Sequence, residues 1–400
     1  MRRNTIIIAI IMMVMTLFGC TTAKETVQVT PVPAAVEKAQ VFESGIAEIQ
    51  KYGNLTLDIS SKVLLDAGFE YGDIIKVCVN GNEHLIPFCT NYSDVDTGSM
   101  VIRVKGDTVI VAINMGDFAK ANGIAVKEKH EDGSYEWIFP EGKTLESYIV
   151  TLEMAEKEGY KEEYLIHQLE RTNERKDYSA DDVFANFREI RSGKLGEGAL
   201  FRSSSPINNE IGRASYSDAF ARKNRIKRVM NLADNAELIE GYHSKEDFKS
   251  PYYYALFKDG NVIALNLGVD FKAEEFKKGL AEGLRFFADN EGPYLVHCTE
   301  GKDRAGFTSA LLEAFMGATF DEIVNDYMKS YENYYHVEKN SEQWNAVRDS
   351  NIVKQLELIT GSSTPEKSNL VKAAENYMKD IGLDKAEIDR LRKNLSRNYR

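Results

Sequence analysis

A chain of 400 residues, 43% hydrophobic and 10% aromatic, is long enough for two or three domains and too apolar to be disordered throughout. Its 62 acidic and 50 basic residues give a formal net charge of −12, which disfavours nucleic acid and anionic bilayers as partners. An anionic substrate therefore requires a local concentration of positive potential.

The first twenty residues have the layout of an export signal: two arginines, an apolar run over 6–18, and the ending "LFGC". This run is too short to span a membrane comfortably. Its ending resembles the lipobox of bacterial lipoproteins, which implies that residues 1–20 are a signal peptide ending at a lipidated Cys20. We therefore expect an extracytoplasmic protein, attached to a bacterial membrane through its N-terminal lipid. The alternative is an uncleaved signal anchor in which the cysteine is incidental.

The next two segments differ sharply in pattern. Residues 21–50 begin rich in threonine, valine and proline and lack a core pattern, which predicts a tether. Residues 51–145 contain alternating runs and turns, such as "NLTLDI" and "SMVIRVKGDTVIVAINM". They predict a small all-β module, either a barrel or a sandwich.

Part of this module resembles a known domain. The stretch "YGDIIKVCVNGNEHLIPFCTNYSDVDTGS", residues 71–99, is similar to the C-terminal β domain of the SAM hydroxide adenosyltransferase family. The catalytic domain that accompanies it in that family is not visible in this sequence. The resemblance therefore implies a β fold and no chemistry.

The same stretch contains two of the cysteines. A tight turn at Asn80-Gly81 would place Cys78 opposite Glu83, leaving Cys89 about six residues, roughly 20 Å, further along the hairpin. A disulfide requires α-carbons within about 7 Å. We therefore expect two buried free thiols.

Residues 146–176 are charged and helix-prone, which predicts a helical connector. From residue 177 to residue 400, apolar strand patterns alternate with helical ones. The predicted strands are "ALFRSS", "IKRVMNL", "VIALNL" and "PYLVHC". This alternation predicts an α/β domain, a sheet flanked by helices.

The segment "HCTEGKDR", residues 297–304, carries the chemistry. It lies between a buried strand and a helix, where unpaired backbone N–H groups and the helix dipole attract an anion. We expect a cysteine at a helix N-terminus, such as Cys298, to be a reactive nucleophile, and the fork of Arg304 can hold two phosphate oxygens. The residues thus describe a nucleophile facing a trapped phosphate.

Other readings of these residues are simpler. Cys298 could be a small hydrophobe that closes a strand, and Arg304 a surface residue, but their combination with the strand and the helix favours a phosphate-binding loop. We expect His297 to be structural, orienting the loop, because the other histidines are scattered along the chain. No metal or other cofactor is expected.

The loop resembles that of the cysteine-dependent tyrosine phosphatase superfamily, specifically the bacterial subgroup whose loop reads HC-x-x-GKDR-x-G. Residues 184–206, "FANFREIRSGKLGEGALFRSSSP", are similar to the opening segment of that subgroup. Residues 319–335 resemble the DY-containing helix that follows its loop, and 382–395 suit its closing helix. The resemblance covers about 177–400.

This resemblance implies a tyrosine phosphatase-like catalytic domain and a two-step reaction. Cys298 would attack phosphorus to form a phosphocysteine, which water then hydrolyses. Arg304 and the loop amides would hold the phosphate oxygens. The substrate-phosphate-binding set is Thr299, Glu300, Gly301, Lys302, Asp303 and Arg304.

An acid must also protonate the leaving oxygen. Asp270 stands before Cys298 where the wider superfamily carries its mobile-loop acid, whereas Asp303 is part of the subgroup's loop motif. Both have a structural alternative, because Asp270 could cap the following helix and Asp303 could form an ion pair or cap. The sequence favours neither Asp270 nor Asp303 as the general acid, and it ranks Asp234 below both.

Two further loop residues bear on function. In the related subgroup, the lysine at the position of Lys302 accompanies activity on phosphoinositides as well as phosphotyrosine. Ala305 departs from the superfamily, which usually has serine or threonine there to help the cysteine leave. We therefore expect a phosphatase acting on phosphotyrosine proteins or phosphoinositides; the alternative is a phosphoresidue-binding lipoprotein with little or no turnover.

Overall fold

The computed structural model describes residues 40–400. Cys20, with the signal peptide and most of the predicted tether, lies outside these residues. Within them, no helix is long and apolar enough to cross a membrane.

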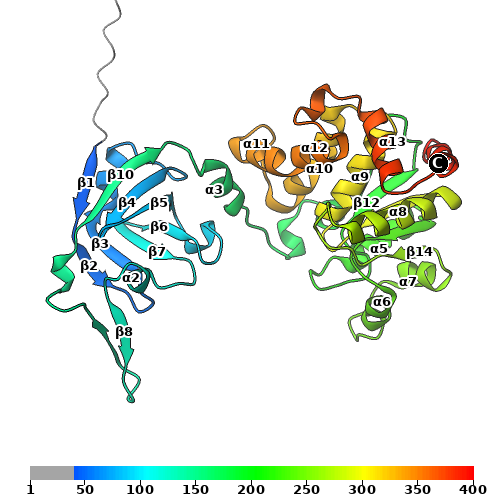
Figure 1. The fold of residues 1–400 in the computed structure, drawn as a ribbon. Helices are drawn as coiled ribbons and strands as arrows, with labels where there is room; N and C mark the ends of the chain where they lie inside the picture. The colour runs from blue at the N-terminus through cyan, green and yellow to red at the C-terminus, as the bar shows by residue number, and fades with distance from the viewer. Residues whose placement is uncertain (1–39) are drawn as a thin grey trace, which may run out of the picture. The chain divides into compact units, whose positions relative to one another are not determined.

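The N-terminal module is a curled eight-stranded sheet with the order β1-β10-β4-β5-β6-β7-β3-β2 (Figure 1). β1 and β2 are separated only by Gly45, yet they stand at opposite ends of this order, pairing with β10 and β3. One stretch of chain therefore closes the sheet into a barrel. Its strands are β1 (Val41–Ser44), β2 (Ile46–Ile49), β3 (Leu55–Ser60), β4 (Ile74–Val79), β5 (Asn82–Cys89), β6 (Met100–Lys105), β7 (Thr108–Ile113) and β10 (Val150–Glu156).

Shorter elements complete this module. A separate hairpin pairs β8 (Val126–Lys129) with β9 (Tyr135–Ile138). The helices are α1 (Ser61–Asp66), α2 (Phe118–Ala121) and α3 (Lys161–His167).

The hairpin register predicted around the cysteines is confirmed. Cys78 pairs with Glu83 across β4 and β5, and both Cys78 and Cys89 are free. Cys89 is buried, but Cys78 is only half-buried, so that part of the prediction is wrong. The reason is that β4 alternates, and the cysteine falls on the less buried face of the strand.

Strands also occur where none were predicted. β1 and β2 lie within the range assigned to the tether, and β10 lies within the range assigned to the helical connector. β10 reads "VTLEMAE", and its glutamates, leucine, methionine and alanine favour a helix in isolation. Pairing with β1 and β4 overrides that preference, because Val150 and Leu152 enter the barrel core. Only α3 is an α-helix within the predicted connector.

The C-terminal part contains a five-stranded sheet with the order β11-β12-β15-β13-β14. Its strands are β11 (Arg188–Glu189), β12 (Leu200–Ser203), β13 (Arg228–Asn231), β14 (Val262–Ala264) and β15 (Tyr294–His297). The last four are the predicted strands and run parallel, with β15 in the centre. Parallel strands gather their carboxyl ends at one edge, where ligands bind in such sheets.

Helices cover both faces of this sheet. Alternate residues of its strands point to opposite sides: Met230, Tyr294 and Val296 join one core, whereas Val229 and Leu295 join the other. The helices are α4 (Asp181–Phe184), α5 (Ala214–Lys223), α6 (Ala236–His243), α7 (Pro251–Lys258), α8 (Glu274–Asp289), α9 (Asp303–Phe315), α10 (Phe320–Tyr335), α11 (Glu342–Arg348), α12 (Lys354–Thr360), α13 (Leu370–Asp380) and α14 (Lys385–Leu395).

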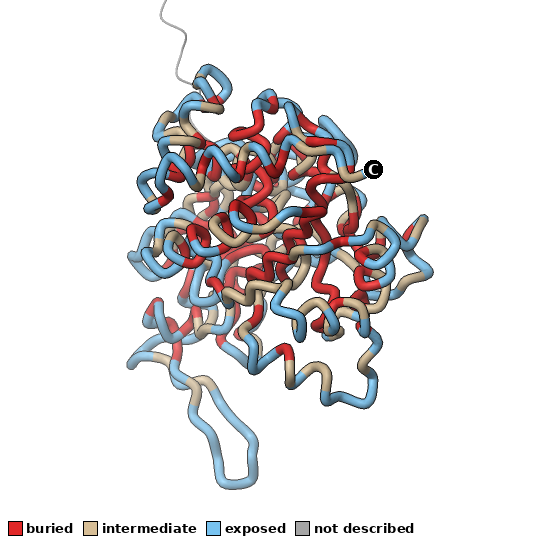
Figure 2. The backbone as a smooth tube through the Cα atoms, turned by 90° about the vertical axis from the view of Figure 1, so that its right-hand side faces the viewer, coloured by how far each residue is buried: buried red, intermediate tan, exposed pale blue. Residues whose placement is uncertain are grey.

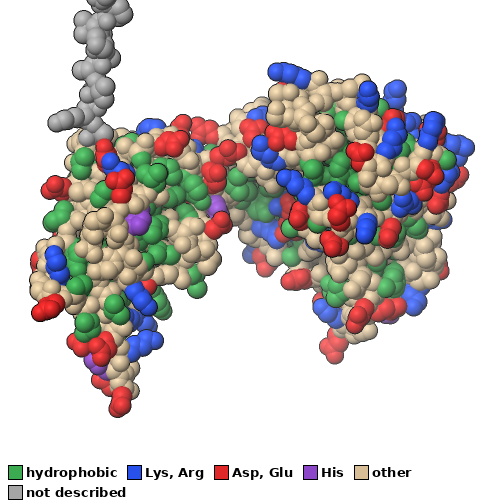
Figure 3. Space-filling model, viewed as in Figure 1, with side chains coloured by type: hydrophobic (Ala, Val, Ile, Leu, Met, Phe, Trp, Pro, Cys, Tyr) green, Lys and Arg blue, Asp and Glu red, His purple; other side chains and the backbone are tan. Residues whose placement is uncertain are grey.

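The segments that lead into and out of the loop over 298–302 are buried. All four residues of β15 are buried, as is every residue of α9 after Arg304, and such buried stretches form the interior of Figure 2. On the face drawn in Figure 3, basic and acidic side chains are intermixed over the outer helices. The loop is therefore held between two buried segments.

Candidate active site

Cys298 directly follows the central strand β15, and α9 begins five residues later at Asp303. His297 is in register with Ser203 on one neighbouring strand and with Asn231 on the other. The loop over 298–302 therefore emerges where the carboxyl ends of three parallel strands meet. Cys298 is buried and free.

Hydrogen-bond donors from other elements hold the carbonyl groups of this loop. The Glu300 carbonyl accepts from Asn186 Nδ2 at 3.1 Å and from Tyr334 Oη at 2.7 Å. Arg202 Nη2 donates to the carbonyls of Gly301 at 2.9 Å and of Lys302 at 3.1 Å. Because the N–H and C=O of a planar peptide point in opposite directions, anchoring the carbonyls turns the amides the other way. Such a ring of amides is an anion cradle.

Gly301 permits this turn of the loop. Its φ is +70°, in the left-handed region that a side chain disfavours. A Cβ there would also collide with the backbone of Ser203, and would lie 2.8 Å from the nitrogen of Ser204. Only glycine therefore fits where the loop crosses the end of β12.

Arg202 is fully buried and its charge is balanced by Asp326, at 2.6 Å. Arg188 also pairs with Asp326, at 2.7 Å. Burial opposes ionisation of Asp326, but Arg188 and Arg202 outweigh it and lower the pKa of that carboxyl to about 2. These two arginines and Asp326 thus form a scaffold for the loop, and the segments 184–206 and 319–335 meet beneath it.

The side chain of Arg304 curls back over the loop. Its Nη1 donates to the carbonyl of Leu267 at 2.9 Å and its Nη2 donates to Thr299 Oγ1 at 3.1 Å. No acceptor among residues 40–400 bonds to its Nε. The Nε and Nη2 edge, which binds oxyanions in a bidentate manner, therefore keeps donors for a phosphate.

His297 supports the backbone of the nucleophile. The Asn231 amide donates to Tyr253 Oη at 2.8 Å, so this hydroxyl donates to His297 Nε2, 3.1 Å away. His297 Nδ1 then carries the proton and donates to the carbonyl of Cys298 at 3.3 Å. Complete burial lowers the pKa of His297 to about 3, so the ring is neutral. The structural role expected for this histidine agrees with these bonds.

The charged side chains of the loop are paired with one another or with neighbours. Lys302 Nζ lies 3.2 Å from Asp303 and 3.9 Å from Glu300, and 4.9 Å from the ring centre of Tyr331. Burial disfavours the ammonium, but the carboxylates outweigh it and the pKa of Lys302 is raised. Glu300 also pairs with Arg171 at 2.5 Å. Lys302 is therefore engaged within the loop rather than presented as a free second cation.

The candidate acids occupy different surroundings. Asp303 forms the ion pair with Lys302, whereas Asp270 is exposed and accepts a hydrogen bond only from the backbone nitrogen of Lys272, at 3.0 Å. Asp270 follows Leu267, the residue whose carbonyl binds Arg304. Asp234 is buried and bound to Asn231 and Tyr242, so it belongs to the network behind His297. Asp303 thus adjoins the loop directly, whereas Asp270 lies three residues after the contact between Leu267 and Arg304.

Sequence reasoning missed Asn186, Tyr334 and Asp326. Each lies in a segment that was matched as a motif, but no local pattern indicated which atoms reach the loop carbonyls. Within residues 40–400, no group of histidine, cysteine, aspartate and glutamate side chains is arranged to hold a metal ion.

The neutral state of His297 makes stability depend on pH. Between pH about 6.5 and 3, the imidazole of His297 binds a proton in the unfolded chain but not in the native protein. The free energy of unfolding therefore falls as pH falls. We expect the free energy of unfolding of the wild type, minus that of His297→Asn, to decrease by about 1.4 kcal/mol per pH unit from pH 6 to 4. Urea unfolding followed by circular dichroism measures it.

His167→Asn serves as the control, because His167 is exposed at the end of α3. The difference between its free energy of unfolding and that of the wild type is expected to stay constant with pH. Parallel pH profiles for the wild type and His297→Asn would contradict the buried neutral ring.

Family models match two parts of this chain. The family model described as "SAM hydroxide adenosyltransferase C-terminal domain" matches residues 45–131. Among solved structures, an uncharacterized conserved protein from Thermotoga maritima is similar at 19% identity, over 28% of this chain and 35% of that chain, with a TM-score of 0.21. The comparison with curated proteins gives no match. The model of the tyrosine phosphatase family matches residues 184–397, more than half of the chain, and the protein therefore belongs to that family.

Proposed function

We propose that this protein hydrolyses phosphate monoesters, phosphotyrosine or phosphoinositide, through a phosphocysteine on Cys298. The tyrosine phosphatase family domain supports phosphatase activity in general. The observation that carries the mechanism is the position of Cys298, at the start of a loop whose carbonyls are anchored outward and whose Arg304 lies over it.

In the first step, Cys298 Sγ forms a bond to phosphorus while the bond from phosphorus to the leaving oxygen breaks, and an acid gives that oxygen a proton. The loop amides and the Nε and Nη2 edge of Arg304 stabilise the charge on the three equatorial oxygens. In the second step, water attacks phosphorus, the thiolate leaves and inorganic phosphate is released. Because the carboxylates of Glu300 and Asp303 are paired with cations, these residues would bind phosphate through their amides.

We further propose that the lipid on Cys20 places the catalytic domain outside the cytoplasm, at a bacterial membrane. The support is the layout of the first twenty residues: basic, then apolar, then a small residue before cysteine. Phosphorylated proteins and lipid headgroups would both be within reach of an enzyme anchored in this way.

The first test is phosphate release by the purified full-length chain in detergent, from a phosphotyrosine peptide and from a short-chain phosphoinositide. We expect release, and its loss by at least about a thousandfold in Cys298→Ser, because a serine hydroxyl is not ionised at neutral pH. Cys78→Ser, a half-buried cysteine in the barrel, is the matched control and should release phosphate as the wild type does. Undiminished activity of Cys298→Ser would contradict the proposed mechanism.

We propose Asp270 as the general acid, because among residues 40–400 it has no ion-pair partner, whereas Asp303 is held by Lys302. Phenyl phosphate needs a protonated leaving group far more than p-nitrophenyl phosphate does. We expect Asp270→Asn to lower kcat on phenyl phosphate by about a hundredfold and on p-nitrophenyl phosphate much less. Asp303→Asn should affect both substrates equally, through the loop. The reverse pattern would assign the acid to Asp303.

One observation favours a second candidate, a protein that binds phosphorylated residues with little turnover. Ala305 is fully buried next to Arg304 and offers no hydroxyl to assist departure of the thiolate, and the hydroxyl of Thr308 lies about one helical turn further on. If hydrolysis of the phosphocysteine limits turnover, one added hydrogen bond to the charged sulfur should raise kcat.

We therefore expect Ala305→Ser to raise kcat by about tenfold and to reduce the pre-steady-state burst of leaving group. Rapid-mixing kinetics with p-nitrophenyl phosphate measure both quantities. An absence of phosphate release from the wild type and from Ala305→Ser, with phosphopeptide binding retained, would favour the binding protein over the enzyme.

A further inference from the structure

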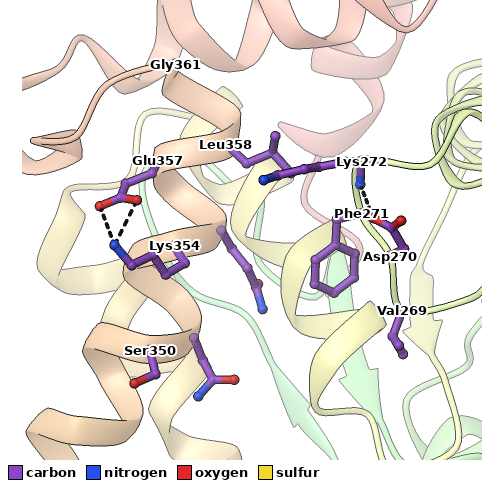
Figure 4. A pocket seen from close by; sticks show the side chains of 11 residues that line it. Val269, Asp270, Phe271, Lys272, Ser350, Lys354, Glu357, Leu358 and Gly361 are labelled. Atoms are coloured by element: carbon purple, nitrogen blue, oxygen red, sulfur yellow. Dashed lines mark hydrogen bonds and ion pairs between the residues drawn. The ribbon is translucent and has the colours of Figure 1, made fainter. Parts of the chain in front are cut away.

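A pocket of about 650 Å³ is lined by two segments that contact α9 or its neighbours. One wall is the segment over 269–272, which links β14 to α8, and the other is formed by α12 and the π-helical turn that precedes it, η4 (Asp349–Val353) (Figure 4). Its size is that of pockets that bind small ligands or side chains. A π-helical turn is rare and frequently marks a functional site.

The first wall is continuous with the active site. Leu267, two residues before Val269, accepts a hydrogen bond from Arg304 through its carbonyl. The ring of Phe271 stacks on Phe307 of α9, with centroids 4.7 Å apart and planes 12° apart. Asp270, the acid proposed above, also lines the pocket. A leaving group beside Asp270 would therefore extend toward this pocket.

The second wall is also tied to the loop. Gln355 of α12 donates from Nε2 to Tyr327 Oη at 3.0 Å. Tyr327 packs over the first turn of α9, where a Cβ on Gly306 would come within 2.5 Å of its ring. Both walls are thus held by residues that contact the helix carrying Arg304, so the pocket keeps a set position relative to the loop.

The lining combines apolar surface with a few polar groups. Val269, Phe271 and Leu358 supply the apolar part, and Val269 is 65% exposed. Gln355 is 6% exposed and its Oε1 has no hydrogen-bond donor among the described residues. This oxygen lies beneath the surface of the pocket, so the accessible lining is mainly apolar.

One cation in this lining is available. Figure 4 shows the side chain of Lys272 extending across the pocket toward Leu358, and within residues 40–400 Lys272 has no ion pair. Lys354, the other lysine, is bound to Glu357 at 3.1 Å. A headgroup with several phosphates would require more free cations than this lining supplies. A ligand with an apolar side chain next to an acidic one requires only an apolar surface and one unpaired cation, and this lining supplies both.

We propose that this pocket binds the residues adjacent to phosphotyrosine in a peptide substrate, an apolar residue beside an acidic one. The apolar side chain would lie on Val269, Phe271 and Leu358, and its carboxylate neighbour would pair with Lys272. Because Asp270 lines the pocket, a phosphotyrosine whose leaving oxygen lies beside Asp270 would bring its neighbouring residues to the pocket. The proposal rests on the function proposed above.

Binding to the full-length Cys298→Ser protein tests the pocket separately from turnover. Two phosphotyrosine peptides are compared by fluorescence anisotropy, one with leucine and glutamate on each side of the phosphotyrosine and the other with serine and lysine. We expect the first peptide to bind roughly tenfold more tightly. Adding Lys272→Glu should reduce this ratio at least roughly fivefold, because an attractive charge pair becomes a repulsive one.

Lys278→Glu, added to the same protein, is the matched control. It makes the same charge change on α8 at an exposed position that does not line the pocket, and the ratio should be unchanged. Lys272 is also exposed, so its replacement does not threaten folding. Addition of salt should lower the ratio in the parent protein and in the control alike.

Several outcomes would overturn the proposal: equal binding of the two peptides, a ratio that Lys272→Glu leaves intact, or a short-chain phosphoinositide that binds more tightly than both and loses affinity on Lys272→Glu. The last result would assign the pocket to a lipid headgroup. Failure of the wild type to release phosphate would instead contradict the enzymatic function, and leaves these binding ratios measurable.

Discussion

The structure of the active site depends on the anchoring of the loop carbonyls. Asn186, Arg202 and Tyr334 come from three separate elements, and each donates to a carbonyl of Glu300, Gly301 or Lys302. A loop of this length has no secondary structure to satisfy its backbone, so these donors determine which way its peptides face. In the proposed function, the loop would bind phosphate through that orientation more than through any one side chain.

This arrangement requires buried charge. Arg188 and Arg202 share one carboxylate, Asp326, and burial raises the pKa of nearby Glu313 well above its ordinary value. Two arginines of a chain whose net charge is −12 are thus gathered beneath the loop. The cost of burying these groups is offset only while all of them remain paired.

The loop itself carries less free charge than its sequence indicates. Lys302, Glu300 and Asp303 neutralise one another, with Arg171 joining Glu300. In the proposed function, discrimination between substrates would then depend on surfaces outside the loop. The segment that follows β14 is the candidate surface, since it binds Arg304 through Leu267 and continues into the wall of the neighbouring pocket.

The sequence alone was sufficient to predict the elements that depend on local pattern. The four parallel strands, the helix after Arg304 and the register that sets Cys78 opposite Glu83 follow from apolar periodicity and turn chemistry, which act over a few residues. The proposed nucleophile and the proposed phosphate-binding arginine were evident for the same reason, because one contiguous loop contains both.

Only the tertiary structure decided the rest. β10 became a strand against its own propensity because two neighbours paired with it. Arg202 and Asn186 became the supports of the loop because β12 and the segment before it pass beneath a turn about one hundred residues later in the chain. The hydrogen-bond partner of a buried polar group depends on which segments pack together in the fold. Local sequence patterns do not predict contacts between segments that are far apart in the chain.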